Sequence, residues 1–121
     1  MDSLFQIPAE CKGRITELKE GRGYELKKPI PIFIIKNRKR VEAWAIDERN
    51  MPLLIIPNQP MGVGNTREEA SQDIADQLID VFEDLIEIRR ENKGRFNYSF
   101  QAHSYNRLEK YLTPLNSEGW K

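Results

Sequence analysis

The sequence predicts an α+β fold: a small antiparallel β-sheet, one long amphipathic helix packed on one face of it, and a short C-terminal helix. Three observations predict this arrangement. Short β-branched apolar runs occupy residues 30–56, a capped stretch with helical periodicity follows from residue 67, and apolar residues spaced by three and four close the chain. Because 121 residues suit one domain, we expect residues 1–121 to form a single unit.

The composition excludes several classes of protein. The 19 Lys and Arg residues balance 19 Asp and Glu residues, which argues against a general affinity for nucleic acid or anionic lipid. A lone Cys11 excludes an intramolecular disulfide and a Cys-rich zinc site. No apolar run approaches the roughly 20 residues of a membrane helix, and the start MDSLFQIPAE lacks the pattern of a signal peptide. We therefore expect a cytoplasmic protein that does not contact a membrane.

The segment from residue 8 to residue 28 allows two interpretations. Residues 14–19 and 24–27 flank a glycine-containing turn, which is typical of a β-hairpin. Alternatively, a short helix begins after Pro8, although Gly13 would weaken it by about 1 kcal/mol. The pattern favours the hairpin.

An antiparallel meander is predicted next. Residues 30–35 are apolar and β-branched, and Pro31 indicates an edge strand or the start of a strand. After a polar turn at 37–40, residues 41–47 alternate: Val41, Ala43 and Ala45 share one face, and Glu42, Trp44 and Ile46 share the other. The apolar run 53–56, bracketed by prolines, is predicted as the third strand.

A long helix is predicted from Arg67 to about Arg90, with Gly94 as its stop. Thr66 and Glu69 are spaced as a capping box, and Gly62–Thr66 is interpreted as a flexible turn, since it lacks the lysine and the third glycine of phosphate-binding loops. We expect burial of one helix face at Ile74, Leu78, Val81, Phe82 and Leu85.

The opposite face of this helix carries a stripe of carboxylates. Residues 61–90 hold 3 basic and 8 acidic side chains. The stripe, called the acidic stripe below, consists of Glu69, Asp73, Asp76, Asp80, Glu83 and Glu87. We expect Asp73, Asp76 and Asp80 to be exposed and the stripe to bind a basic partner.

The C-terminal part is predicted as a strand followed by a helix. Phe96, Tyr98 and Phe100 alternate with polar residues, which is strand periodicity. The helix would run from Ser104, as its N-cap, to about Thr113, and its apolar face would carry Tyr105, Leu108, Leu112 and Leu115.

The residues offer little for catalysis or for metal binding. His103 is the only histidine, and no second catalytic group stands at a recognisable spacing from it. Nothing near Cys11 marks an activated thiolate. No histidine joins the helical carboxylates, and no loop resembles an EF-hand. The prediction is a protein that is not an enzyme, with no metal and no cofactor.

An alternative function is binding of RNA or DNA. Lys36, Arg38, Lys39 and Arg40 surround the predicted turn between the first two strands of the meander, and Trp44 lies close by for base stacking. The aromatic stretch 96–100 offers a second stacking surface. Overall neutrality favours the acidic stripe and a protein partner.

The order of elements resembles the HicB antitoxin family. The resemblance rests on strand, turn, strand and a Gly-containing loop that leads into Thr66–Ala70 and an amphipathic helix, and it covers about Ile30 to Leu85. It implies a partial ribonuclease-H-like domain and a non-enzymatic antitoxin that occludes a small basic ribonuclease toxin. The third strand and the N-terminal segment depart from the family pattern, and no room is left for a DNA-binding module. An exposed edge strand would also favour a homodimer.

Overall fold

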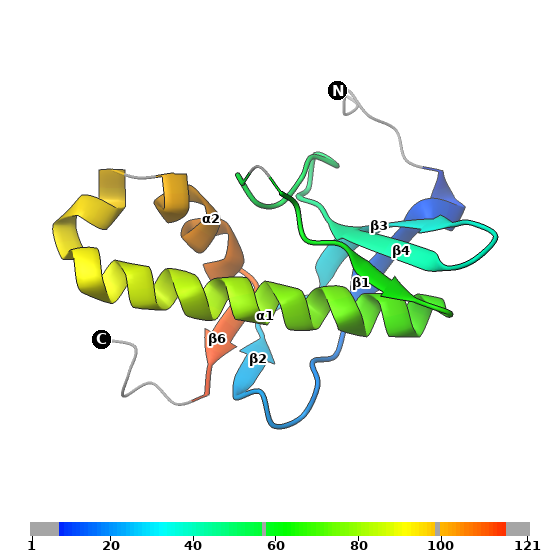
Figure 1. Cartoon of the computed structure of the whole chain (residues 1–121), viewed down its shortest axis with the longest axis horizontal. Coiled ribbons are helices and arrows are strands. Elements are labelled where there is room, and N and C mark those ends of the chain that lie inside the picture. Colours follow the sequence, from blue (N-terminus) through cyan, green and yellow to red (C-terminus); the bar gives the residue numbers. More distant parts are fainter. Residues whose placement is uncertain (1–7, 57, 99, 116–121) are drawn as a thin grey trace.

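The computed structural model has the predicted α+β architecture and describes residues 8–56, 58–98 and 100–115 (Figure 1). A long helix, α1 (Arg67–Asn92), spans the molecule. A four-stranded sheet packs on its N-terminal half, and a second helix, α2 (Phe100–Glu109), packs on its C-terminal half (Figure 1). Residues 1–7 and 116–121 lie outside the described part of the chain. The prediction that the start MDSLFQIPAE is not a signal peptide therefore falls mostly on residues outside this part.

The four-stranded sheet is antiparallel throughout. It contains β1 (Lys12–Ile15), β3 (Ile30–Lys36), β4 (Val41–Ala45) and β5 (Gly62–Gly64), in the order β1-β3-β4-β5. Pro31 is the second residue of β3, as predicted for a strand start, but β3 lies inside the sheet and not at its edge. The Pro31 carbonyl accepts a hydrogen bond from the Ile46 N–H at 3.0 Å.

The core lies between this sheet and α1. Alternation along β3 and β4 buries Ile30, Ile32 and Ile34 together with Val41, Ala43 and Ala45, as predicted for β4. Seven buried residues of α1 pack against these strand residues or against α2: Ala70, Ile74, Ala75, Leu78, Ile79, Phe82 and Leu85. Full burial of each large apolar side chain contributes about 1.5–3 kcal/mol, so this layer holds the fold together.

Helix α1 begins and ends close to the predicted positions. The Glu69 N–H donates to the Thr66 hydroxyl at 3.1 Å, whereas the Glu69 carboxylate accepts from the Asn65 N–H at 2.9 Å, one residue before the expected partner. The predicted buried face is confirmed except at Val81, which is only half-buried against the core.

The third predicted strand, residues 53–56, is wrong. Only an isolated bridge between Ile46 and Pro52 joins this region to β4, although Leu53 and Leu54 are buried. The Leu53 N–H still donates to the Ala45 carbonyl of β4 at 3.1 Å. Beyond it, side chains take the place of a neighbouring strand: Ser104 accepts from the Ile55 N–H, and Gln59 donates to the carbonyl groups of Leu54 and Ile56.

The fourth strand of the sheet is β5, where a flexible turn was predicted. A Cβ atom at Gly62 would lie 2.6 Å from the Ile74 nitrogen, and one at Gly64 would lie 2.7 Å from the Ala70 nitrogen. Only glycine therefore lets a strand lie directly against the backbone of α1. The two glycines serve close packing and not flexibility.

The predicted N-terminal hairpin is also wrong, because its two strands pair with different partners. β1 pairs with β3, whereas β2 (Tyr24–Leu26) pairs with β6 (Leu112–Pro114) in a separate two-stranded sheet. The alternative helix is reduced to one 3-10 turn, η1 (Ala9–Cys11). The connection between β1 and β2 lies beside α1, where the Gln72 amide donates to the Glu17 carbonyl at 3.2 Å. Gly21 and Gly23, both at positive φ, flank Arg22 near the end of this connection.

The strand predicted at residues 96–100 is wrong. A 3-10 helix, η2 (Lys93–Tyr98), and the first residue of α2 occupy this stretch. Phe96 is buried and packs edge-on against Tyr105, with ring centroids 5.5 Å apart. Burial of an aromatic ring at the end of α1 thus overrides an alternating pattern of only five residues. The side chains of Tyr98 and Phe100 lie outside the described part of the structure.

The last helix is present but shifted toward the N-terminus. Ser104 is not its N-cap; it lies inside α2 and is fully buried. Tyr105, Leu108 and Leu112 are buried as predicted, whereas Leu115 is 64% exposed because the chain leaves the helix after Glu109 and forms β6.

Candidate functional site

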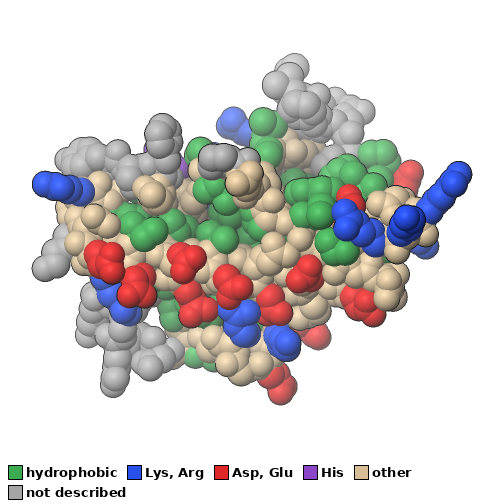
Figure 2. Space-filling model, in the orientation of Figure 1, with side chains coloured by type: hydrophobic (Ala, Val, Ile, Leu, Met, Phe, Trp, Pro, Cys, Tyr) green, Lys and Arg blue, Asp and Glu red, His purple; other side chains and the backbone are tan. Residues whose placement is uncertain are grey.

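The acidic stripe follows α1 along the outside of the molecule, where carboxylates form a row over the helix (Figure 2). The predicted exposure is only partly correct. Asp80 is exposed, with 66% of its side chain accessible, whereas Asp73 and Asp76 are half-buried. The reason is that other parts of the chain contact the stripe.

The N-terminal end of the stripe binds backbone groups of the same chain. The Asp73 carboxylate accepts a hydrogen bond from the Val63 N–H at 2.8 Å and one from the Gln77 amide at 3.3 Å. Asp73 thereby fastens the edge strand β5 to α1. Glu69 caps the helix through Asn65, close to the role that the capping-box spacing predicts. The structural role of Asp73 was not indicated by the sequence pattern.

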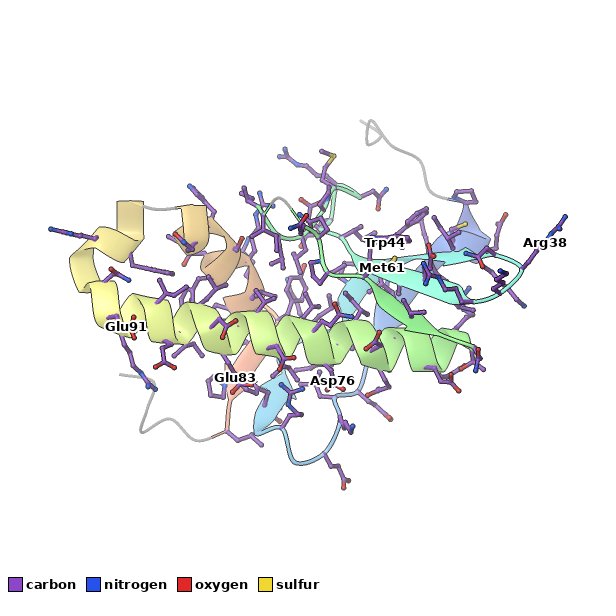
Figure 3. The ribbon with its side chains drawn as sticks, viewed as in Figure 1. Arg38, Trp44, Met61, Asp76, Glu83 and Glu91 are labelled. Carbon is purple, nitrogen blue, oxygen red and sulfur yellow. The ribbon has the colours of Figure 1, made fainter. Side chains whose placement is uncertain are left out.

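The middle of the stripe holds one arginine. Arg22, from the connection between β1 and β2, donates from Nη1 to Asp76 at 3.0 Å and from Nη2 to Asp80 and Glu83, the latter at 3.1 Å. Burial lowers the pKa of Arg22, but the hydrogen bonds with Asp80 and Glu83 outweigh it and raise the pKa above its ordinary value. The stripe therefore binds a guanidinium group across two helical turns (Figure 3 labels Asp76 and Glu83).

Tyr24 connects this ion cluster to the core. Its ring lies 6.0 Å from the ring of Phe82, and burial raises the pKa of its phenol to about 12, with a further contribution from the charge of Glu83. The ring of Tyr24 and the guanidinium of Arg22 thus cover one side of α1.

Glu87 is the member of the stripe that stays free. It is exposed, and within the described residues it forms no hydrogen bond or ion pair. Asp84 and Glu91 on the same helix are exposed as well, so the C-terminal half of α1 presents carboxylates to solvent. Glu91 lies at this end of α1 in Figure 3.

The second predicted site, the basic turn, is a tight connection between β3 and β4. The Asn37 side-chain oxygen accepts from the N–H groups of Lys39 and Arg40, both at 3.0 Å, which holds the turn in one conformation. Arg40 pairs with Glu42 at 2.7 Å, whereas the side chain of Arg38 extends away from the tip (Figure 3).

The strand register sorts the residues of this second site. Lys36 is opposite Val41, whose side chain is buried under the helix, so Lys36 lies on the helix side of the sheet. Trp44 is opposite Phe33 on the outer side, and the two rings are 6.1 Å apart. Phe33 was not selected from the sequence, although the alternation of residues 30–35 places it outward.

The remaining chemically interesting residues are scattered. His103 is exposed on α2 and Cys11 is half-buried in η1. No group of three or more His, Cys, Asp or Glu residues within the described ranges is arranged to hold a metal ion. A hollow of about 380 Å³ beside β1 and β3 is lined by both basic and acidic residues, among them Lys12, Arg14, Asp47 and Glu48.

Comparison with protein-family models, with curated proteins and with solved structures found no match to this chain. Among the described residues, no helix combines the length and the apolar character needed to cross a membrane.

Proposed function

We propose that this protein is a non-enzymatic binding module that occludes a small basic protein through Glu87 of the acidic stripe and the exposed carboxylates beside it on α1, Asp84 and Glu91. A HicB-like antitoxin that blocks a ribonuclease toxin in the cytoplasm, acting as a homodimer, is the concrete form of this proposal. The observation that carries it is the contact between Arg22 and the carboxylates of α1.

The contact with Arg22 supports the proposal because it demonstrates the chemistry that a basic partner would use. One guanidinium group reaches three carboxylates whose spacing of four and three residues places them on one face of the helix. Farther along α1, Asp84, Glu87 and Glu91 continue the exposed acidic surface. An arginine or lysine of a partner can bind there without displacing any group from the part of the chain that the structure describes.

Affinity purification from the native host, with the chain as bait, tests the proposal. Wild-type bait should retain a small basic protein in near-stoichiometric amount, identified by mass spectrometry. A variant that neutralises the exposed carboxylates at the C-terminal end of α1 should lose it: Asp84→Asn, Glu87→Gln and Glu91→Gln.

A matched control neutralises three exposed carboxylates that belong to the chain before β3 and not to α1: Glu17→Gln, Glu20→Gln and Glu25→Gln. This control should retain the partner, because it changes the net charge by the same amount as the first variant but leaves the carboxylates of α1 in place. Equal loss in both variants, retention in both, or wild-type bait that holds no basic protein would each contradict the proposal.

A further inference from the structure

The outer face of the four-stranded sheet carries an aromatic pair that the fold leaves open to solvent. Phe33 on β3 and Trp44 on β4 are directly opposite each other, with ring centroids 6.1 Å apart and planes tilted by 37°. Both are only half-buried, whereas their neighbours on the inner face are buried under α1. Ile35, beside them, is 37% exposed. Aromatic rings on an open sheet face are the surfaces on which unpaired bases stack.

Basic side chains border this pair on two sides. Lys12 on β1 is opposite Phe33, and Arg14 is opposite Pro31, so both lie on the outer face. Both are exposed. At the end of the hairpin, Arg38 and Lys39 project from a turn that Asn37 holds in place.

The strands of this face carry one acidic residue, Glu42, and it is already neutralised. Asp47 and Glu48, which follow β4, line the same hollow as Lys12 and Arg14, and Glu48 pairs with Lys28 at 3.7 Å. Glu42 lies on the outer side of β4, where its carboxylate accepts from the Arg40 guanidinium at 2.7 Å and from the Asn37 amide at 3.4 Å. Within the described residues, Lys12, Arg14, Arg38 and Lys39 form no side-chain ion pair. A surface with stacking rings at its centre and unpaired cations at its border is complementary to a polyanion with exposed bases.

We propose that this outer face binds single-stranded nucleic acid. Bases stack on Trp44 and Phe33, while Arg38 and Lys39 bind phosphates on one side and Lys12 and Arg14 bind phosphates on the other. The site is independent of the acidic stripe, which lies along α1, on the opposite side of the sheet. It differs from the basic turn considered by itself, because Lys36 faces the helix side and Arg40 is held by Glu42.

Fluorescence anisotropy with a labelled single strand of about 12 nucleotides tests this proposal. Oligothymidylate and oligouridylate are compared, and a duplex of the same length serves as competitor. Wild-type protein should bind one or both single strands more tightly than the duplex, and the stronger of the two identifies DNA or RNA. Failure to bind either strand at low salt, or equal binding of the duplex, would overturn the proposal.

Three variants separate stacking from charge. Trp44→Leu and Phe33→Leu keep an apolar side chain on the sheet and should each weaken binding by about tenfold or more. The double variant Arg38→Gln and Lys39→Gln should weaken binding and make the slope of log K against log salt shallower by about 0.7 for each phosphate that is no longer neutralised. Thermal unfolding of each variant confirms that the fold is retained.

The matched control neutralises one exposed lysine before β2 and one exposed arginine in η2, Lys19→Gln and Arg95→Gln. It removes the same charge and should bind as the wild type does. Equal weakening in the control, or unchanged binding in Trp44→Leu, would reduce the interaction to general electrostatics and overturn the proposal. The proposal would also be overturned if the wild-type protein bound no strand and self-associated through this face while Trp44→Leu was monomeric.

Discussion

The acidic stripe on α1 and the basic hairpin between β3 and β4 look alike in the sequence, as runs of one charge, but the fold treats them differently. Within the described residues, Glu69, Asp73, Asp76, Asp80 and Glu83 each bind another group of the chain. On the hairpin, Arg40 alone of the four predicted basic residues is paired through its side chain with an acid. Most carboxylates of the acidic stripe therefore bind other groups of the folded chain, whereas most cations of the hairpin are available to a partner.

Whether a charged side chain is available to a partner depends on the element that carries it. A carboxylate on a helix that packs against a sheet has backbone N–H groups and loop cations within reach, as Asp73 has Val63 and Asp76 has Arg22. A cation at the tip of a hairpin extends away from the rest of the chain, as Arg38 does (Figure 3). The availability of a charge depends on its distance from the core and not on its sign or density.

The largest expected effect comes from truncating a side chain in the core between α1 and the sheet, which supports both the acidic stripe and the hairpin. Leu78 is fully buried between α1 and the sheet, so Leu78→Ala should lower the free energy of unfolding by about 2–5 kcal/mol. Urea unfolding monitored by circular dichroism measures it. Val81→Ala, at a half-buried position of the same helix, should cost less, and equal costs would show that the helix is oriented differently.

The second prediction contrasts two members of the acidic stripe. Asp73→Ala leaves the Val63 N–H without its acceptor, and should cost about 1–3 kcal/mol of the free energy of unfolding. Glu87→Ala removes an exposed carboxylate without a described partner and should change stability by less than about 0.5 kcal/mol. Denaturant titration of both variants provides the measurement. Similar effects in the two variants would remove the distinction between engaged and free carboxylates.

The third prediction concerns pH. The pKa of Tyr24 is raised from 10.0 to about 12 in the folded protein, first by burial and then by Glu83. Between these values the unfolded chain releases the phenol proton while the folded protein keeps it, so the free energy of unfolding falls as the pH rises from 10 to 12. The stabilising contribution is fully present below pH 10.

Two variants test this linkage between the stripe and the core. Tyr24→Phe should leave stability at neutral pH nearly unchanged and should remove part of the fall above about pH 10, as measured by urea unfolding across this range. Glu83→Gln should lower the pKa of Tyr24, because it removes a charge that raises this pKa, and the change should be visible in the ultraviolet titration of tyrosinate. An unchanged alkaline titration in Glu83→Gln would exclude the electrostatic contact between the two residues.

Local sequence patterns were sufficient where they extended over several turns or a whole strand. The helix from Arg67, its cap at Thr66 and the faces of β4 followed from periodicity, because each pattern repeats often enough to outweigh any single contact. The acidic stripe was found as a pattern for the same reason. Its partners were not found, because Arg22 reaches it from 54 residues away along the chain.

Short patterns failed where a distant segment decided the outcome. Residues 53–56 have the composition of a strand, yet Gly62–Gly64 takes that place, since only glycines fit against the backbone of α1. Residues 96–100 alternate like a strand, yet Phe96 turns inward to Tyr105. The first predicted hairpin separates because β2 finds its partner in β6, close to the C-terminal end of the described chain.

Periodicity, capping and composition were enough to predict the fold class, the long helix and the two charge clusters, since these signals act within a few residues of one another. Strand pairing, the binding of carboxylates within the chain and the meeting of two aromatic rings on the outer face could not be predicted in this way. Those outcomes depend on contacts between segments far apart in the chain, and the free energy of such contacts is set by packing that no local pattern contains.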